Sequence, residues 1–149
     1  MIFEKNGFVK MKSKIAGTWK LKSFESRSKD GDVFYPFGEN PKGFLMYDKS
    51  GYMSGMMSRA DRPNLLVNMV NMDESEKASL SEGFIGYSGK YEILDDKIIH
   101  HVEMSFIPNW IGKPLDRFYS FENDDLVLTT PPEVFNNKNF VHYIVWEKL

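Results

Sequence analysis

Residues 98–112, IIHHVEMSFIPNWIG, hold the densest group of side chains that could do chemistry. Two histidines are adjacent, and Glu103 follows His101 at a spacing of two. Imidazole and carboxylate groups serve as metal ligands and as acid–base catalysts. Side chains alternate between the two faces of a β-strand, so His100 and His101 would face opposite ways. His101 and Glu103 supply two ligands, where a zinc site needs about three or four. We therefore expect no metal site.

The same alternation makes His100 the candidate of most interest. It groups His100 with Met104 and other mostly apolar residues, which we expect to face the interior. In the following run LDRFYSF, Arg117 and Tyr119 share a face with two apolar residues. A buried imidazole or guanidinium needs a polar partner. His100 and Arg117 are thus the candidate catalytic residues, and either a protein carboxylate or a ligand could be the partner of Arg117.

Tyrosines and methionines on inward faces could line a binding cavity. Tyrosine covers an apolar ligand while its hydroxyl forms a hydrogen bond, and methionine adapts to irregular shapes. The same residue types are also ordinary core residues. The expected ligand-binding set is Tyr47, Met53, Tyr87, Tyr91, His100, Met104, Arg117 and Tyr119.

Composition limits the class of protein. The 149 residues suit one domain, and their net charge of -2 is spread without a basic stripe, so we expect neither a nucleic-acid nor a membrane partner. There is no cysteine, and no run approaches the length of a membrane helix, so we expect a cytoplasmic protein. No nucleophile elbow, phosphate loop or dinucleotide fingerprint occurs, and we expect no cofactor.

Short β-type runs separated by turn signals predict an all-β protein. Turn signals lie at Asp30-Gly31, at Asp95-Asp96 and over 123–125. A capping-box pattern that begins at Asp73 predicts one short inserted helix. We predict an N-terminal arm over 1–12 and a single domain over 13–149. The expected architecture is an up-and-down antiparallel barrel of about 8–10 strands, with a β-sandwich as the alternative.

The chain resembles the lipocalin-like domain family of small bacterial and fungal barrel proteins. The first long strand opens with Gly17-Thr18-Trp19, and further stretches follow in the family's order. They include GTWKLKSFE, GENPKGFLMYDKSGYMSGMM, GYSGKYEI, IIHHVEMSFIPNWIGKPLDRF, LVLTTPP and WEK. The resemblance implies a lipocalin-type barrel with an internal cavity, and Trp19 at one end. It also implies that Arg117 could pack over Trp19 instead of contacting a ligand. It implies no reaction, and the apolar loop over 64–72 departs from the pattern.

Three functions remain open from the sequence. The first is binding of a small hydrophobic or amphipathic molecule inside the barrel. The second is a cyclase or isomerase acting on a hydrophobic substrate there, with His100 as acid or base and Arg117 or a tyrosine stabilising negative charge. The third is an interaction module without a ligand, with a homodimer formed through a barrel edge.

Overall fold

The computed structural model describes residues 2–65 and 68–149, which form ten strands and four helical segments. The strands are β1 (Gly17–Ser28), β2 (Val33–Phe34), β3 (Lys42–Tyr47), β4 (Tyr52–Ser58), β5 (Phe84–Ile93), β6 (Lys97–Ser105), β7 (Pro114–Glu122), β8 (Asp125–Thr129), β9 (Glu133–Phe135) and β10 (Lys138–Lys148). The helices are α1 (Ile2–Ile15) and α2 (Glu74–Ser81), and two short 3-10 turns are η1 (Met69–Asn71) and η2 (Pro108–Trp110).

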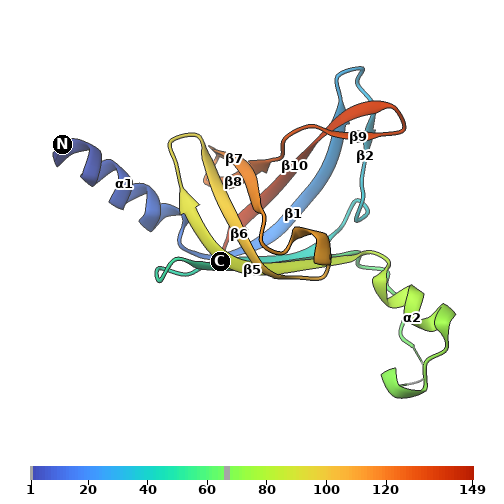
Figure 1. The fold of residues 1–149 in the computed structure, drawn as a ribbon. Coiled ribbons are helices and arrows are strands. Elements are labelled where there is room, and N and C mark those ends of the chain that lie inside the picture. The colour runs from blue at the N-terminus through green and yellow to red at the C-terminus, as the bar shows by residue number, and fades with distance from the viewer. Residues whose placement is uncertain (1, 66–67) are drawn as a thin grey trace.

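Antiparallel pairing of sequential strands closes the sheet into a barrel (Figure 1). The sheet order is β2-β1-β3-β4-β5-β6-β7-β8-β10-β9, and the additional pairing of β1 with β10 joins the two sides. Eight strands form the closed barrel, while β2 and β9 extend the far ends of β1 and β10. Closure leaves no free edge in the barrel wall. The predicted up-and-down barrel is confirmed, and the β-sandwich is excluded.

Tight turns with left-handed backbone set the register of two hairpins. Asn123 and Asp124, at the predicted turn, have φ values of 49° and 71° and connect β7 to β8. Asn136 and Asn137 have φ values of 49° and 61° and connect β9 to β10. Asparagine and aspartate tolerate this conformation better than most residues. The second hairpin was not predicted, because its β9 strand has only three residues.

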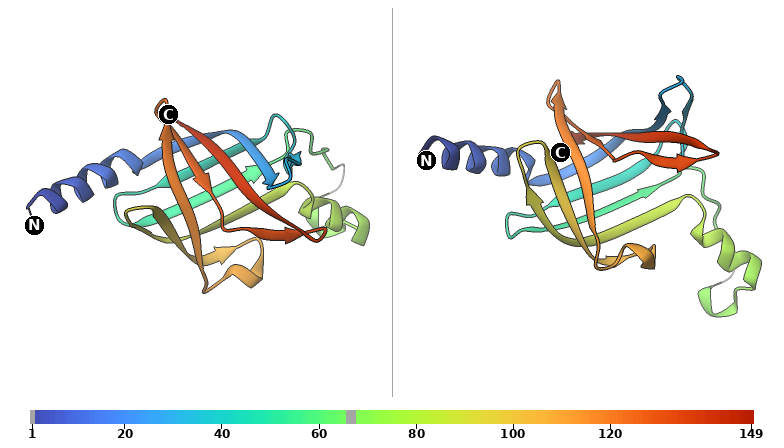
Figure 2. Two further views of the ribbon diagram at one scale, coloured as in Figure 1. Left: turned by 90° about the horizontal axis from the view of Figure 1, so that it is seen from above. Right: turned by 45° about the horizontal axis from the view of Figure 1, so that its top comes forward.

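The barrel is packed solid at the end from which α1 leaves. Trp19 is buried there and its Nε1 donates a hydrogen bond to the Ile15 carbonyl oxygen at 2.8 Å. The Lys148 ammonium lies 5.2 Å from the Trp19 ring centre and donates to the Lys14 carbonyl oxygen. This packing attaches the last turn of α1 to the barrel, whereas the rest of the helix extends away from it (Figures 1 and 2).

Helix α1 was not predicted, because its apolar residues do not gather on one face. Residues 2–14 contain lysines, methionine and no proline, a composition compatible with a helix. Within the arm expected over 1–12, residues 2–12 are helical, and the helix continues to Ile15. Neither described helix combines the length and apolarity needed to cross a membrane.

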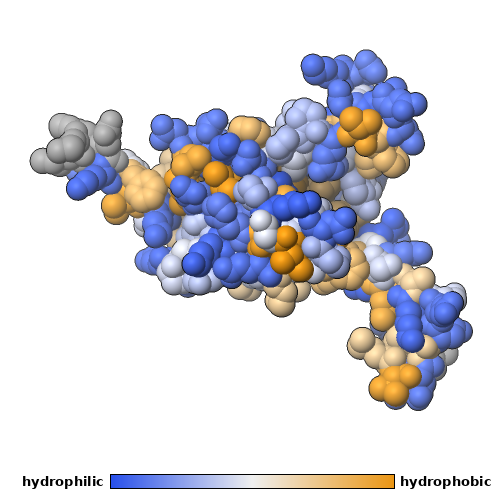
Figure 3. Space-filling view, in the orientation of Figure 1, coloured by the Kyte–Doolittle hydropathy of each residue, from blue (hydrophilic) through white to orange (hydrophobic). Residues whose placement is uncertain are grey.

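The barrel face in view is mainly hydrophilic, with small separate apolar areas (Figure 3).

Helix α2 begins where the sequence predicted. Asp73 accepts a hydrogen bond from the Glu76 backbone, and the Glu76 side chain accepts one from the Asp73 backbone. This reciprocal capping box satisfies two donors that would otherwise lack partners. The segment that contains α2 projects from the barrel toward the end opposite α1, where β2 and β9 also lie (Figure 2).

A β-bulge in β6 reverses the predicted direction of Met104. The pairing with β5 runs from Gly89–Val102 to Ser88–Met104, which leaves Glu103 as an extra residue. A bulge of one residue exchanges the two faces for everything that follows. Val102 is therefore buried, whereas Met104 is 68% exposed and faces outward. The prediction that Met104 faces the interior is wrong.

The bulge depends on a glycine in the neighbouring strand. A Cβ at Gly89 would collide with the His101 carbonyl oxygen and lie 2.9 Å from the Glu103 amide nitrogen. We expect Gly89→Ala to lower the free energy of unfolding by at least ~1–3 kcal/mol, the usual cost of overpacking. Urea titration followed by circular dichroism measures this. The control is Gly7→Ala in α1, where a Cβ meets nothing within 4 Å. Wild-type stability for Gly89→Ala would contradict the described bulge.

Candidate functional site

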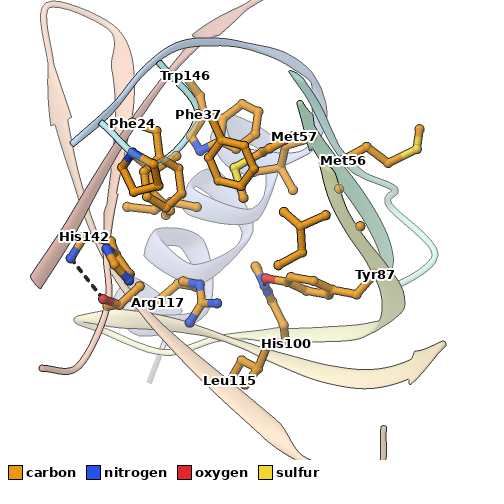
Figure 4. A pocket seen from close by; sticks show the side chains of 18 of the residues that line it. Phe24, Phe37, Met56, Met57, Tyr87, His100, Leu115, Arg117, His142 and Trp146 are labelled. Carbon is orange, nitrogen blue, oxygen red and sulfur yellow. Dashed lines mark hydrogen bonds between the residues drawn. The ribbon is translucent and has the colours of Figure 1, made fainter. Parts of the chain in front are cut away.

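The half of the barrel opposite the Trp19 end contains a cavity of about 270 Å³ (Figure 4). Gly55 of β4 lies between Leu45 of β3 and Tyr87 of β5 in the sheet, and it adds no side chain to the interior. The wall is mainly apolar and aromatic, and it includes Phe24, Phe37, Leu45, Met57, Ile85, Trp110, Leu115, Leu128, Ile144 and Trp146. A largely apolar wall with a few polar groups is typical of sites for small organic molecules.

The predicted ligand-binding residues separate into three groups. Tyr87, His100 and Arg117 line the cavity. Tyr47, Met53 and Tyr91 are buried in the packed core and do not line it. Met104 and Tyr119 form the third group, which does not line the cavity either. Met104 lies outside the barrel, and the Tyr119 hydroxyl donates to the Leu94 and Asp95 carbonyl oxygens, both at 3.2 Å. Strand alternation identifies inward residues but does not tell which half of the barrel is filled.

Two tyrosines hold His100 from opposite sides. The Tyr47 hydroxyl lies 2.6 Å from Nε2 of His100, and the Tyr87 hydroxyl lies 2.7 Å from Nδ1. The three side chains come from β3, β5 and β6, so they form a short chain of hydrogen bonds across the interior. His100 is only 1% exposed, and both of its ring nitrogens are satisfied.

The burial of Tyr47 fixes the direction of these hydrogen bonds. Among the described residues, His100 Nε2 is the only hydrogen-bond partner of the Tyr47 hydroxyl. A buried phenol must donate to an acceptor, so Nε2 carries no proton. The neutral ring then carries its proton on Nδ1 and donates it to the Tyr87 oxygen. The Tyr87 hydroxyl proton is thereby left free to point into the cavity.

The surroundings keep this chain uncharged. Burial, with the Arg117 cation as a second cause, holds the pKa of His100 well below its usual value of 6.5. Burial also raises the pKa of Tyr47 well above its usual value of 10.0. His100 is therefore neutral at physiological pH. Both of its nitrogens are engaged by tyrosines, so His100 reaches a molecule in the cavity only through Tyr87, and a direct acid–base role of His100 is not supported.

Arg117 lies on the same side of the cavity as Tyr87 and His100 (Figure 4). Its Nη1 donates to the carbonyl oxygen of Asp116 at 2.9 Å. No carboxylate of the described residues lies within salt-bridge distance of it, because Asp116 pairs with Lys97 instead, at 3.0 Å. The cation over the Trp19 ring is Lys148, so the packing of Arg117 on Trp19 does not occur.

A second histidine lies on the wall near the strand extensions. His142 Nδ1 is 2.6 Å from Ser26 Oγ, and its Nε2 is 3.2 Å from Glu133 Oε2. A serine, a histidine and a carboxylate joined in this order resemble the catalytic triad of hydrolases. Ser26, however, is 0% exposed and does not line the cavity, so its hydroxyl cannot reach a substrate. These residues support the wall, and sequence reasoning missed them because they are far apart along the chain.

The two tryptophans of the cavity wall contribute in different ways. Trp110, in η2, packs edge-to-face on Tyr87 with 5.8 Å between ring centres. The Nε1 of Trp146 is buried without a hydrogen-bond partner among the described residues.

Outside the barrel, His101 lies 3.3 Å from Glu92 on the exposed face, as strand alternation predicted.

Comparison with known proteins gives two similarities. Residues 16–149 match the model of a family described as "Lipocalin-like domain". A fungal protein of Aspergillus oryzae, the "4'-hydroxy-3'-methoxypropiophenone carrier protein ppsC", is 32% identical over 85 residues. That alignment covers 51% of this chain and 77% of the fungal protein.

The buried imidazole makes stability depend on pH. The ring takes up a proton near pH 6.5 in the unfolded chain but not in the folded one, so acid favours unfolding. We expect the free energy of unfolding to fall by up to ~1.4 kcal/mol per pH unit below this value. His100→Gln should remove this dependence, whereas His101→Gln should keep it.

Nitrogen-15 NMR of the imidazole tests the same group directly. We expect neutral His100 with its proton on Nδ1, and no protonation while the protein stays folded near pH 6. An Nε2-protonated ring, or an ordinary histidine titration, would contradict the described chain of hydrogen bonds.

Proposed function

Because this chain belongs to the family of lipocalin-like domains, we propose that it binds a small, largely apolar molecule non-covalently in its barrel. The observation that carries the proposal is the cavity of about 270 Å³ with its mainly apolar and aromatic wall. The partial similarity to a carrier protein supports binding as the purpose of the cavity.

The size of the cavity favours a compact ligand. Typical small-molecule sites enclose ~300–1,000 Å³, so this cavity of about 270 Å³ lies just below that range. A single substituted ring fits this volume better than a long lipid chain does. The carrier similarity agrees, since the molecule named for the fungal protein has one aromatic ring.

Aromatic side chains give the wall edges and faces suited to a flat ring. Phe24 and Phe37 meet edge-to-face at 5.1 Å, and Trp110 meets Tyr87 in the same way. Aromatic pairs favour such offset and edge-to-face arrangements, and a ligand ring can join them. We therefore propose single-ring phenyl ketones, phenols and phenylpropenoic acids such as cinnamic acid as the first compounds to test.

A larger side chain that fills the cavity should weaken ligand binding. Leu115 lies on the wall, and Leu115→Trp should place an indole inside the cavity. Isothermal titration calorimetry with the compounds named above should give binding by the wild type, and at least tenfold weaker binding by Leu115→Trp, or about 1.4 kcal/mol.

Ser120→Trp is the matched control, since Ser120 lies on the same strand and is exposed. It should bind like the wild type. Binding of no compound by the wild type, or undiminished binding by Leu115→Trp, would contradict the proposal.

A further inference from the structure

We propose that the ligand carries an ionised oxygen, a carboxylate or an acidic phenol, which Arg117 and Tyr87 hold together. This inference rests on the proposed function and specifies the chemistry of its ligand. The polar side of the cavity supplies a cation and a directed hydrogen-bond donor, and both call for an acceptor with negative charge.

The first step concerns the charge of Arg117. The guanidinium lines the cavity, and among the described residues no carboxylate lies within 4.0 Å of it. Its Nη1 bonds only the preceding carbonyl oxygen, which leaves further donors for a ligand. A planar guanidinium pairs with a carboxylate through two parallel hydrogen bonds, a geometry that a neutral group satisfies less well.

The second step concerns the other charged groups of the wall. Glu133 also lines the cavity, but it lies 3.2 Å from His142 and its side chain is 65% exposed. Glu133 is thus directed to the rim, where its charge is paired or hydrated. His100 is buried and neutral between its tyrosines. Arg117 is therefore the charge on the wall that a ligand can meet.

The third step concerns Tyr87. Its oxygen accepts the proton of His100 Nδ1 at 2.7 Å, so its own hydroxyl hydrogen is available to the cavity. Tyr47 holds this arrangement from behind, because its hydroxyl occupies Nε2 at 2.6 Å. A phenol that already accepts one hydrogen bond is polarised toward donating the next. Tyr47 and His100 are positioning residues, and Tyr87 is the group that touches the ligand.

Matched pairs of compounds test the charge requirement by calorimetry. Cinnamate is compared with methyl cinnamate. 4'-Hydroxy-3'-methoxypropiophenone, at a pH that ionises its phenol, is compared with 3',4'-dimethoxypropiophenone. We expect the ionised member of at least one pair to bind tenfold or more tightly, and the pair that shows this identifies the oxygen as carboxylate or phenolate.

Arg117→Met should abolish that preference by weakening the ionised member alone. Arg27→Met, which removes the same charge from the exposed face of β1, should keep it. Arg117→Lys should restore part of it, and Tyr87→Phe should weaken the ionised member about tenfold or more. These two variants decide the question if Arg117→Met does not fold.

The outcomes separate the two proposals. Equal binding within both pairs overturns the inference while the binding function stands. So does a preference that survives Arg117→Met or, where that variant does not fold, a preference that Tyr87→Phe leaves undiminished. Binding of no compound in either form by the wild type overturns the proposed function itself, and this inference with it.

Discussion

The pairing of β1 with β10 is the constraint on which the rest of the molecule depends. These strands meet from Trp19–Lys148 to Ser28–Phe140, and their union converts a ten-stranded sheet into a closed barrel. Closure brings the packed end and the cavity onto the same two strands. Trp19 seals one end, while His142 and Trp146 of β10 form part of the cavity wall. Loss of this pairing would open the packed end and the cavity together, because β1 and β10 contribute side chains to both.

The buried His100 is the second constraint, and it makes one side of an apolar interior polar. A buried polar group without a partner costs about 1–3 kcal/mol, so the imidazole is tolerated only with both tyrosines in place. A leucine would fill the same space with less risk to stability. Unlike a leucine, the imidazole determines which way the Tyr87 hydroxyl points, and it does so without carrying a charge. A neutral relay beside Arg117 leaves the cation as the dominant charge of the cavity.

Strand alternation and turn residues predicted most of the fold from the sequence. The hairpin at Asn123-Asp124, the capping box of α2 and the inward faces of His100 and Arg117 follow local rules, so they could be recognised. Three features could not be recognised from local rules. The β6 bulge at Glu103 reversed Met104, because a bulge depends on the neighbouring Gly89 and not on the strand's own pattern. Helix α1 has no apolar face to reveal it. The boundary between the packed and hollow halves depends on which side chains meet across the barrel, and so Tyr47 was placed in the cavity when it supports the cavity from behind.

A crystal structure of the protein with an ionised single-ring ligand such as cinnamate tests the account most directly. The account predicts the ring among Phe24, Phe37 and Trp110, with its charged oxygen within hydrogen-bond distance of both the Tyr87 hydroxyl and the Arg117 guanidinium. A ligand in the reverse orientation, with its oxygen at the rim beside Glu133, would contradict it. So would a ligand bound only on the outer surface near Met104, with the cavity unchanged.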